Sequence, residues 1–239
     1  MLYPVELRAL HSLLSGREYA LIGKWALQTG CLRILSKMPA ASHDLPFIRR
    51  LLDVIESEII PLTVAGVAQG NKVFGGAILN KSDLSLVIAG TNNELDNPLW
   101  HGEVHTLKLF YEMPAANRPA TSDCVFLSTH EPCSLCLSAI TWAGFDNFYY
   151  LFGYEDTEDK FNIPHDLRIL DEVFAVKQGQ YRRDNAFWRC FGVDELIDAL
   201  QDPSDQAALQ QRIADLNQVY DALSAAYQAS KKDNEIPLA

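Results

Sequence analysis

The chain has 239 residues, enough for one domain with a substantial core and for additional helices at its ends. Apolar residues make up 48% of it and charged residues 21%, which is the balance of an ordinary globular protein. Its formal net charge of −11 argues against a protein that binds the phosphate backbone, because such proteins normally carry a basic surface. We therefore do not expect a nucleic-acid partner.

The sequence contains no run of about 18 apolar residues, so we expect no membrane span. Charged residues such as Glu6, Arg8 and Arg17 interrupt the apolar stretches near the N-terminus, which excludes a secretory pattern there. The cysteine count is five, an odd number, which argues against a disulfide framework. We expect a reducing compartment and a cytoplasmic location.

The first part of the chain is predicted to be helical. Apolar side chains recur at helical spacing over 5–38, so we expect a helical N-terminal extension covering 1–46. The stretch 41–47 is predicted to be a linker into a helix over 47–60 with a buried stripe of leucine and isoleucine. Pro61 is expected to kink or interrupt that helix.

A β-hairpin is predicted over 72–90, where two apolar runs rich in β-branched residues flank the letters NKSD. Gly75 and Gly76 indicate a bulge, or a point where another group approaches the backbone closely. A loop follows up to Trp100, and helical spacing then predicts a helix over 101–113.

Strands and helices alternate in the next part of the chain. We predict a strand over 124–129, a helix from Pro132 to Ala143, and strands over 148–153 and 173–177. This order indicates an α/β fold in which a mixed central sheet carries helices on its faces.

The C-terminal part of the sequence is predicted to be helical, as an extension over 191–239 that follows a central domain over 47–190. Its segment 203–230 has an apolar stripe. We expect that stripe to pack on the same chain rather than to form a subunit interface, because the other faces of the segment are polar.

Cys133 and Cys136 carry the first chemical signal. They lie in the first turn of the predicted helix after Pro132, and a spacing of three puts both sulfurs on one face. The partial positive charge of a helix N-terminus favours thiolates. By itself the pair suits a redox site or a metal site.

His101 and Glu103 make a metal site the more specific interpretation. They lie at another predicted helix start, and His101 precedes Cys133 by 32 residues. Two helix N-termini from neighbouring crossover units can converge at one edge of a sheet. His101, Cys133 and Cys136 would then hold one zinc ion per chain and leave a fourth position for water, the arrangement of catalytic zinc. Zinc lowers the pKa of a bound water to about 7, and Glu103 could carry the proton to the leaving nitrogen.

The pattern H-x-E followed by P-C-x-x-C is the signature of zinc nucleobase deaminases. The stretches FGGAILN, IAGTNNELDNPLWHGEV and LSTHEPCSLCLSAITWAGFDNFYY resemble the cytidine-deaminase-like superfamily, most closely the branch of bacterial guanine deaminase, fungal cytosine deaminase and tRNA adenosine deaminase. The resemblance covers roughly 47–155. It implies a three-layer α/β/α fold, a zinc deaminase domain over 47–190, and a homodimer.

The resemblance also implies a substrate and the residues that bind it. GTNN, EPC and CLSAITWA are similar to guanine deaminase, whereas HGE followed by VHTL is similar to fungal cytosine deaminase. We expect a free nucleobase or related amino-heterocycle, guanine-like first and cytosine second. Asn92 would bond the ring edge, Phe74 and Trp142 would wall the pocket, and the backbone N–H of Gly102 would contact the substrate. Trp100 would reshape the pocket beside the metal.

Guanine deaminases also use an acidic residue from a C-terminal segment to bind the base, and the comparable stretch 155–166 offers no clear match. Two other interpretations remain open. Cys133 and Cys136 could form a redox pair, which leaves the histidine and glutamate unexplained. The chain could also be a non-catalytic, zinc-binding relative that acts as a structural or partner subunit, although such relatives commonly lack the glutamate found at 103.

Overall fold

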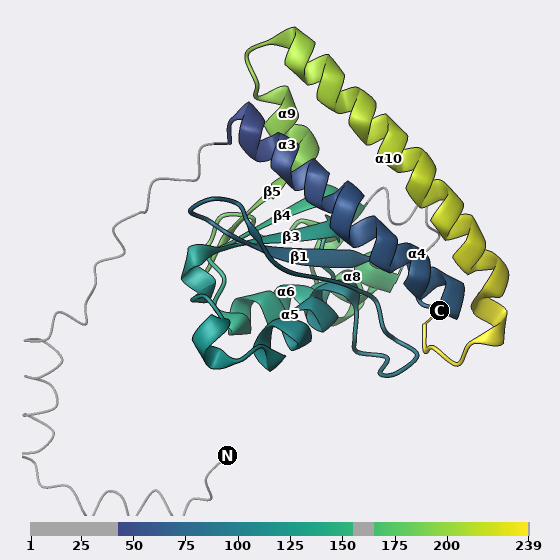
Figure 1. Ribbon diagram of the computed structural model, residues 1–239. Coiled ribbons are helices and arrows are strands. Elements are labelled where there is room, and N and C mark those ends of the chain that lie inside the picture. The colour runs from purple at the N-terminus through teal and green to yellow at the C-terminus, as the bar shows by residue number, and fades with distance from the viewer. Residues whose placement is uncertain (1–42, 155–164, 239) are drawn as a thin grey trace, which may run out of the picture. The chain divides into compact units, whose positions relative to one another are not determined.

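The computed structural model describes residues 43–154 and 165–238 (Figure 1). The chain divides into two compact units, 1–41 and 42–239, and every described residue belongs to the second. The helices predicted within 5–38 lie outside the described residues. Within the described part, no helix has the length and apolar character that crossing a membrane requires.

A mixed sheet of five strands forms the centre of the described unit, as predicted. The strands lie in the order β2-β1-β3-β4-β5. β1 pairs antiparallel with both β2 and β3, whereas β3, β4 and β5 run parallel. Their bounds are β1 Gly75–Asn80, β2 Leu86–Thr91, β3 Cys124–His130, β4 Asn147–Phe152 and β5 Arg189–Gly192.

The predicted hairpin is confirmed as β1 and β2, in a register that pairs Gly75 with Thr91. The register shifts between Ile78 and Leu79, so the bulge lies further along the strand than the glycines. Gly75 instead marks a close approach, because a Cβ there would lie 2.4 Å from the side chain of Ile59. The glycine therefore lets the first helical segment rest directly on the strand.

That first segment is longer than predicted. It comprises α3 (Leu45–Val54), a π-helical turn η1 (Ile55–Ile59) and α4 (Ile60–Gln69). The expectation that Pro61 kinks or interrupts the helix is confirmed, because the α-helical hydrogen bonding gives way to a π turn just before the proline, which stands in the first turn of α4. Proline has no N–H to donate to the preceding turn, and such irregularities are typical beside it.

Helices α5 (Gly102–Glu112) and α6 (Ser134–Ala143) cover one face of the sheet, below it in Figure 1. Both were predicted to within two residues. With the sheet they bury an apolar cluster that includes Phe110, Phe126 and Ile140. The short 3₁₀ turns η2 (Ala115–Asn117) and η3 (Thr121–Asp123) connect this face to β3.

The prediction of a strand over 173–177 is wrong. That segment begins in the last turn of α8 (His165–Phe174), where Val173 and Phe174 are exposed, and Ala175 then takes a positive φ of 56°. The 3₁₀ turn η4 (Lys177–Gly179) follows. The apolar run belongs to a helix that ends at the surface, and the fifth strand forms later, as β5.

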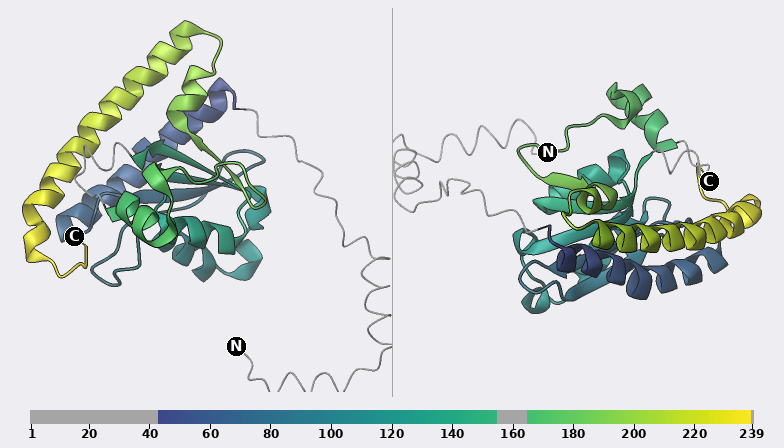
Figure 2. Two further views of the ribbon diagram at one scale, coloured as in Figure 1. Left: turned by 180° about the vertical axis from the view of Figure 1, so that it is seen from behind. Right: turned by 90° about the horizontal axis from the view of Figure 1, so that it is seen from above.

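The opposite face of the sheet is covered by the α3–α4 segment, α9 (Val193–Asp198) and α10 (Pro203–Ser230), with the turn η5 (Lys231–Asp233) at its end (Figures 1 and 2). α10 lies along α3 and α4 in both views, and its apolar stripe joins their core cluster. The prediction that this stripe packs on the same chain is therefore confirmed.

Replacing Leu216 in that stripe with alanine should destabilise the fold. The side chain is 3% exposed within the core cluster, so the substitution leaves a cavity and should lower the free energy of unfolding by about 2–5 kcal/mol. Val219, on the same helix but 38% exposed, supplies the control, and Val219→Ala should cost less than about 1 kcal/mol. Urea unfolding measures both. Equal losses for the two variants would contradict this packing of α10.

Candidate active site

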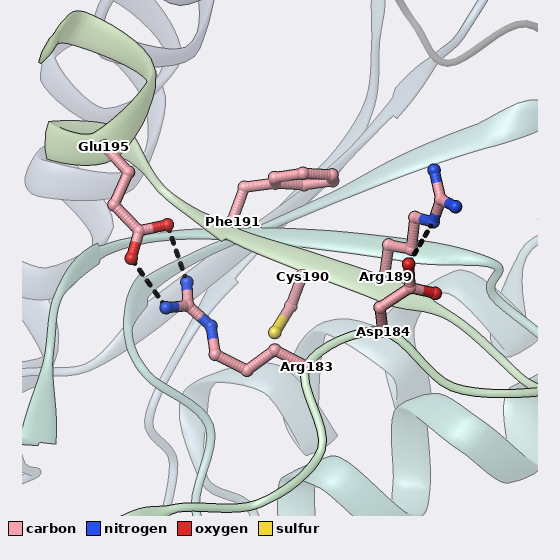
Figure 3. Close-up of a pocket in the computed structure, with 6 residues that line it drawn as sticks. All are labelled: Arg183, Asp184, Arg189, Cys190, Phe191 and Glu195. Carbon is pink, nitrogen blue, oxygen red and sulfur yellow. Dashed lines mark hydrogen bonds and ion pairs between the residues drawn. The ribbon is translucent and has the colours of Figure 1, made fainter. Parts of the chain in front are cut away.

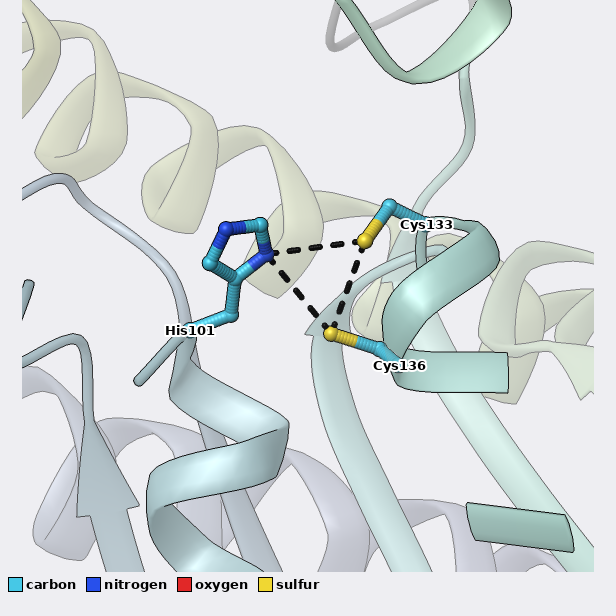
Figure 4. Close-up of side chains that lie close together, drawn as sticks. All are labelled: His101, Cys133 and Cys136. Atoms are coloured by element: carbon cyan, nitrogen blue, oxygen red, sulfur yellow. Dashed lines mark hydrogen bonds between the residues drawn. The ribbon is translucent and has the colours of Figure 1, made fainter. Parts of the chain in front are cut away.

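His101, Cys133 and Cys136 meet where two helices begin (Figure 4). His101 is the N-cap of α5, Cys133 is the N-cap of α6, and Cys136 lies in the first turn of α6. His101 Nδ1 is 3.5 Å from Cys133 Sγ and 3.8 Å from Cys136 Sγ, and the two sulfurs are 3.6 Å apart. The sequence prediction that two helix N-termini bring these side chains together is confirmed.

This donor set fits a zinc ion. Zn–S bonds of about 2.3 Å and a Zn–N bond of about 2.0 Å in a tetrahedron place the ligand atoms about 3.5–3.8 Å apart. The three separations in the structure match these values. Ligand atoms of all three residues lie within 4.8 Å of one another, and both cysteines are buried. Two sulfurs and one imidazole nitrogen are typical zinc ligands, so His101, Cys133 and Cys136 would hold the ion.

The ionisation of Cys133 also suits a metal ligand. Its contact with Cys136, and then with His101, lowers the pKa of the Cys133 thiol well below its ordinary value. Burial opposes protonation of His101, but its contacts with Cys133, Glu94 and Glu103 outweigh burial and raise the pKa of the imidazole to about 9. Cys133 is therefore held as a thiolate by the neighbours that would share the metal.

Glu103 lies against the same group from the first turn of α5 and is buried. Its Oε2 is 3.2 Å from Cys136 Sγ and its Oε1 is 2.9 Å from Ser128 Oγ. Burial, and then the charge on Cys133, raises the pKa of the Glu103 carboxyl. The raised pKa favours the protonated form of the carboxyl, which suits a group that carries a proton.

Ser128 supports a protonated Glu103. Its hydroxyl oxygen is 2.6 Å from the backbone oxygen of His130 and 2.9 Å from Glu103 Oε1. The hydroxyl has one proton, and the His130 carbonyl can only accept. When the hydroxyl donates to that carbonyl, a protonated Glu103 can donate to the hydroxyl, so that both contacts are hydrogen bonds.

A small pocket opens beside these side chains. Among the described residues, four more line it in addition to the histidine, the glutamate and the two cysteines. They are Phe74, His130, Glu131 and Asp166. The structure thus brings Phe74 to the candidate site, with its ring 4.1 Å from that of His130 between centroids.

Sequence reasoning missed the last three of these lining residues. His130 ends β3 and lies next to Glu131, directly before the P-C-x-x-C segment. Their place at the carboxyl end of a strand in the parallel part of the sheet was the available signal. Asp166 ends the stretch 155–166 that offered no clear match, and no periodic pattern relates it to the other site residues.

Glu131 connects the pocket to the segment before β5. Its Oε1 accepts a hydrogen bond from the Tyr181 hydroxyl at 2.7 Å, and its Oε2 accepts one from the backbone N–H of Tyr154 at 3.2 Å. Burial raises the pKa of this carboxyl, which the two hydrogen bonds partly offset. The side chain is therefore fixed in place at the wall of the pocket.

Asn92 and Gly102 bond to each other. Asn92 Oδ1 accepts a hydrogen bond of 2.9 Å from the backbone N–H of Gly102, and Asn92 Nδ2 donates one of 2.7 Å to Glu94 Oε2. Asn92 is buried and caps the first turn of α5 through this contact. The expectation that the Gly102 N–H faces a substrate is wrong here, because Asn92 occupies it. The predicted contact between Asn92 and the ring edge stays a prediction.

Trp142 does not join the site, so the expectation that it walls the pocket is wrong within this chain. Its side chain is 90% exposed on α6. It follows Cys136 by six residues. At about 100° per residue, the two side chains point about 120° apart around the helix. Trp100 also faces elsewhere: its ring stacks on His105 and lies 4.9 Å from Lys108 Nζ.

A second pocket lies along β5 (Figure 3). Arg183 forms a forked ion pair with Glu195, and Arg189 pairs with Asp184. Each guanidinium group of this second pocket thus faces a carboxylate. Its described lining has no histidine, so it lacks the combination of carboxyl, imidazole and two thiols found at α5 and α6.

Gly102→Ala should destabilise the protein, because the new Cβ would lie 2.7 Å from the backbone of Gly75 and 2.8 Å from that of Phe74. Overpacking against backbone should lower the free energy of unfolding by about 1–3 kcal/mol. At Gly192 a Cβ meets only side-chain atoms at 3.5 Å or more, so Gly192→Ala serves as the control. Urea unfolding that ranks the two variants alike would refute the close approach.

Asp166 gives a prediction for pH. Burial, and then the charge on Cys133, raises its pKa to about 8, whereas an aspartate in an unfolded chain has a pKa of about 3.9. Between about pH 4 and pH 8 the folded state therefore keeps a proton that the unfolded chain loses, and stability falls as the pH rises. Asp166→Asn removes this effect, so in chelator-treated protein its stability relative to wild type should increase from about pH 5 to about pH 8.5.

Denaturation curves at the two pH values measure this difference. Asp221→Asn, which removes an exposed carboxylate on α10, is the matched control and should show no such trend. A stability difference for Asp166→Asn that stays constant with pH would contradict the raised pKa.

Comparisons with known proteins bear on this site. Residues 61–152 match the family model described as the zinc-binding region of cytidine and deoxycytidylate deaminases. That match includes all three metal-binding candidates and Glu103. A search of curated proteins finds no match.

Solved structures that match in the course of the backbone include a guanine deaminase from Nitrosomonas europaea. It is 18% identical, the match covers 71% of this chain and 93% of that chain, and the TM-score is 0.43. A guanine deaminase from Bacillus subtilis has 20% identity, coverage of 70% and 90%, and a TM-score of 0.39. A tRNA:A34 deaminase has 16% identity, coverage of 57% and 98%, and a TM-score of 0.36. At these scores the likenesses carry no weight. Residues 61–152 are similar to the zinc-binding region of cytidine and deoxycytidylate deaminases, and the three residues that would hold the metal lie within that stretch.

Proposed function

We propose that the protein catalyses the hydrolytic deamination of a free nucleobase or a related amino-heterocycle, with release of ammonia. One observation carries the proposal: a buried carboxyl, Glu103, lies 3.2 Å from a sulfur of a donor set that fits zinc, in a pocket both share. A redox pair of Cys133 and Cys136 would need neither His101 nor Glu103.

Each residue of this group has a defined part in the proposal. His101, Cys133 and Cys136 would hold a single zinc ion, which supplies a water of lowered pKa when bound. In its ionised form, Glu103 would take one proton of the water through Oε2, which faces these ligands, and pass it to the ring nitrogen. Once the oxygen has bonded to the ring carbon, the same carboxyl would take the second proton of that oxygen and pass it to the amino group, which leaves as ammonia when the C–N bond breaks.

Ser128 and Phe74 prepare the site for this proton transfer. The Ser128 hydroxyl holds Glu103 Oε1, so that the other oxygen points toward the ligands. Phe74 is 7% exposed and offers a flat apolar wall, which suits the face of an aromatic ring and excludes water. The carboxyl thus acts in a site of low polarity, where its raised pKa favours the proton-carrying form.

The charges of the pocket favour an uncharged base over a nucleotide. Three carboxyl groups line it, those of Glu103, Glu131 and Asp166, and the described residues of the lining include neither lysine nor arginine. A phosphate group would meet these carboxyl groups without a cationic partner.

A guanine-like base is our first choice of substrate and cytosine the second. Asp166 occupies the pocket wall and can accept hydrogen bonds when ionised, which suits a ring edge with two adjacent N–H groups. The amino and ring N–H groups of guanine supply such an edge. We further propose that the protein works in the cytoplasm as a homodimer.

Ammonia release from a panel of bases tests the proposal. Zinc-replete protein would be assayed with guanine, cytosine, adenine, isoguanine, aminated triazines, pterins and the matching nucleosides. We expect release from one free base. Glu103→Gln should lower it by about 10²- to 10⁴-fold, because the variant keeps the shape of the side chain but cannot carry the proton.

Zinc content measured on the same samples separates the outcomes. A Glu103→Gln variant that retains zinc and loses activity supports the role of the carboxyl. Wild-type protein that holds zinc and deaminates nothing in the panel would overturn the proposal in favour of a non-catalytic zinc-binding subunit. The matching nucleotides are assayed beside this panel, and activity on a phosphorylated nucleotide alone would contradict the argument from pocket charge.

A further inference from the structure

The two nitrogens of His101 face different partners. Nδ1 points toward the sulfurs of Cys133 and Cys136, at 3.5 and 3.8 Å, whereas Nε2 lies 3.7 Å from Glu94 Oε1. We propose that Glu94, held in place by Lys72, is a positioning residue that orients the His101 ring for metal binding. This inference rests on the zinc site of the proposed function.

Glu94 is buried within a network of hydrogen bonds. Its side chain is 1% exposed, and its Oε1 forms an ion pair of 3.0 Å with Lys72 Nζ, whose side chain is 6% exposed. Its Oε2 accepts a hydrogen bond of 2.7 Å from Asn92 Nδ2. Asn92 in turn accepts one from the backbone N–H of Gly102, the residue after His101. The network therefore holds both the imidazole and the start of the helix that carries it.

The chemistry of the imidazole requires such a partner. A neutral histidine that binds a metal through Nδ1 carries its proton on Nε2, and that proton needs an acceptor to fix the ring. The contact that the structure gives for Nε2 is with Glu94 Oε1, a carboxylate oxygen that can accept this proton. The separation of 3.7 Å is about 0.5 Å longer than an ordinary N–H···O hydrogen bond, so the proposal requires the two groups to move closer when the metal binds.

Burying the ion pair of Lys72 and Glu94 costs free energy, which is understandable if the pair holds the imidazole in position. Removing two charges from water carries a desolvation penalty, and well-packed apolar side chains of similar volume are often at least as stable. Lys72 compensates the charge of Glu94, which would otherwise add to that of the Cys133 thiolate nearby. A compensated carboxylate can accept the Nε2 proton without raising the negative charge of the site further.

Zinc affinity measured by competition with a chromophoric chelator tests the inference without reference to activity. The double variant Lys72→Met/Glu94→Met replaces the ion pair with apolar side chains and leaves no charge unpaired. We expect it to bind zinc about 10- to 100-fold more weakly than wild type. Glu94→Gln keeps the volume and one acceptor oxygen, so its loss should be smaller than that of the double variant.

The matched control removes another ion pair from the far end of β1, where Lys81 Nζ lies 2.6 Å from Asp146 Oδ1. Lys81→Met/Asp146→Asn should leave zinc affinity unchanged. Circular dichroism of each chelator-treated variant checks that it is folded. If the Lys72/Glu94 double variant fails this check, Glu94→Gln decides, and an unchanged affinity there overturns the inference.

Two failures are distinguishable. Wild-type protein that binds no zinc would overturn the metal site and with it the proposed function. Wild-type protein that binds zinc, together with a folded Lys72→Met/Glu94→Met variant of equal affinity, would overturn only the positioning role of Glu94. A loss of the same size in the Lys81/Asp146 control would also overturn it, because the effect would then be a general one of removing an ion pair.

Discussion

The candidate site depends on the convergence of two helix N-termini at one end of the sheet. α5 begins after the long loop that follows β2, and α6 begins directly after β3. Each carries a potential metal ligand at its N-cap, His101 and Cys133. Helix N-termini favour negative charge, so the same placement that gathers the ligands also stabilises the thiolate and the carboxyl beside it.

Close packing of backbone makes this convergence possible. Gly102 at the start of α5 rests against Gly75 at the start of β1, with no space for a Cβ on the former. Asn92 then caps the Gly102 N–H, and Glu94 reaches the far side of the His101 ring. The start of α5 is therefore fixed by a strand, a loop amide and a buried ion pair together, which is how a loop-borne histidine comes to occupy a defined position.

The sequence could predict the parts of this arrangement that depend on local spacing. Cys133 and Cys136 share a helix face because they are three residues apart, and His101 with Glu103 marks the other helix start. Apolar runs located the hairpin and the strands β3 and β4 for similar reasons. These features need only the periodicity of a helix or a strand.

Features that depend on tertiary contacts could not be predicted in this way. Asp166 reaches the pocket from α8. The last turn of this helix reads as a strand in the sequence because it begins an apolar run, yet Val173 and Phe174 are exposed at the surface. The pairing of Lys72 with Glu94 joins two charged residues, a type that is normally exposed to solvent, so the sequence gives no sign of their burial. Trp142 lies in a segment similar to guanine deaminase, yet its angle around α6 directs it away from the site.

The central claim is that His101, Cys133 and Cys136 bind a single zinc ion beside Glu103. X-ray absorption spectroscopy at the zinc edge, on protein quantified by elemental analysis, tests it most directly. We predict one zinc per chain with two sulfur ligands at about 2.3 Å and two nitrogen or oxygen ligands at about 2.0 Å. Zinc-replete conditions that yield no bound metal, or a disulfide between Cys133 and Cys136, would contradict the account.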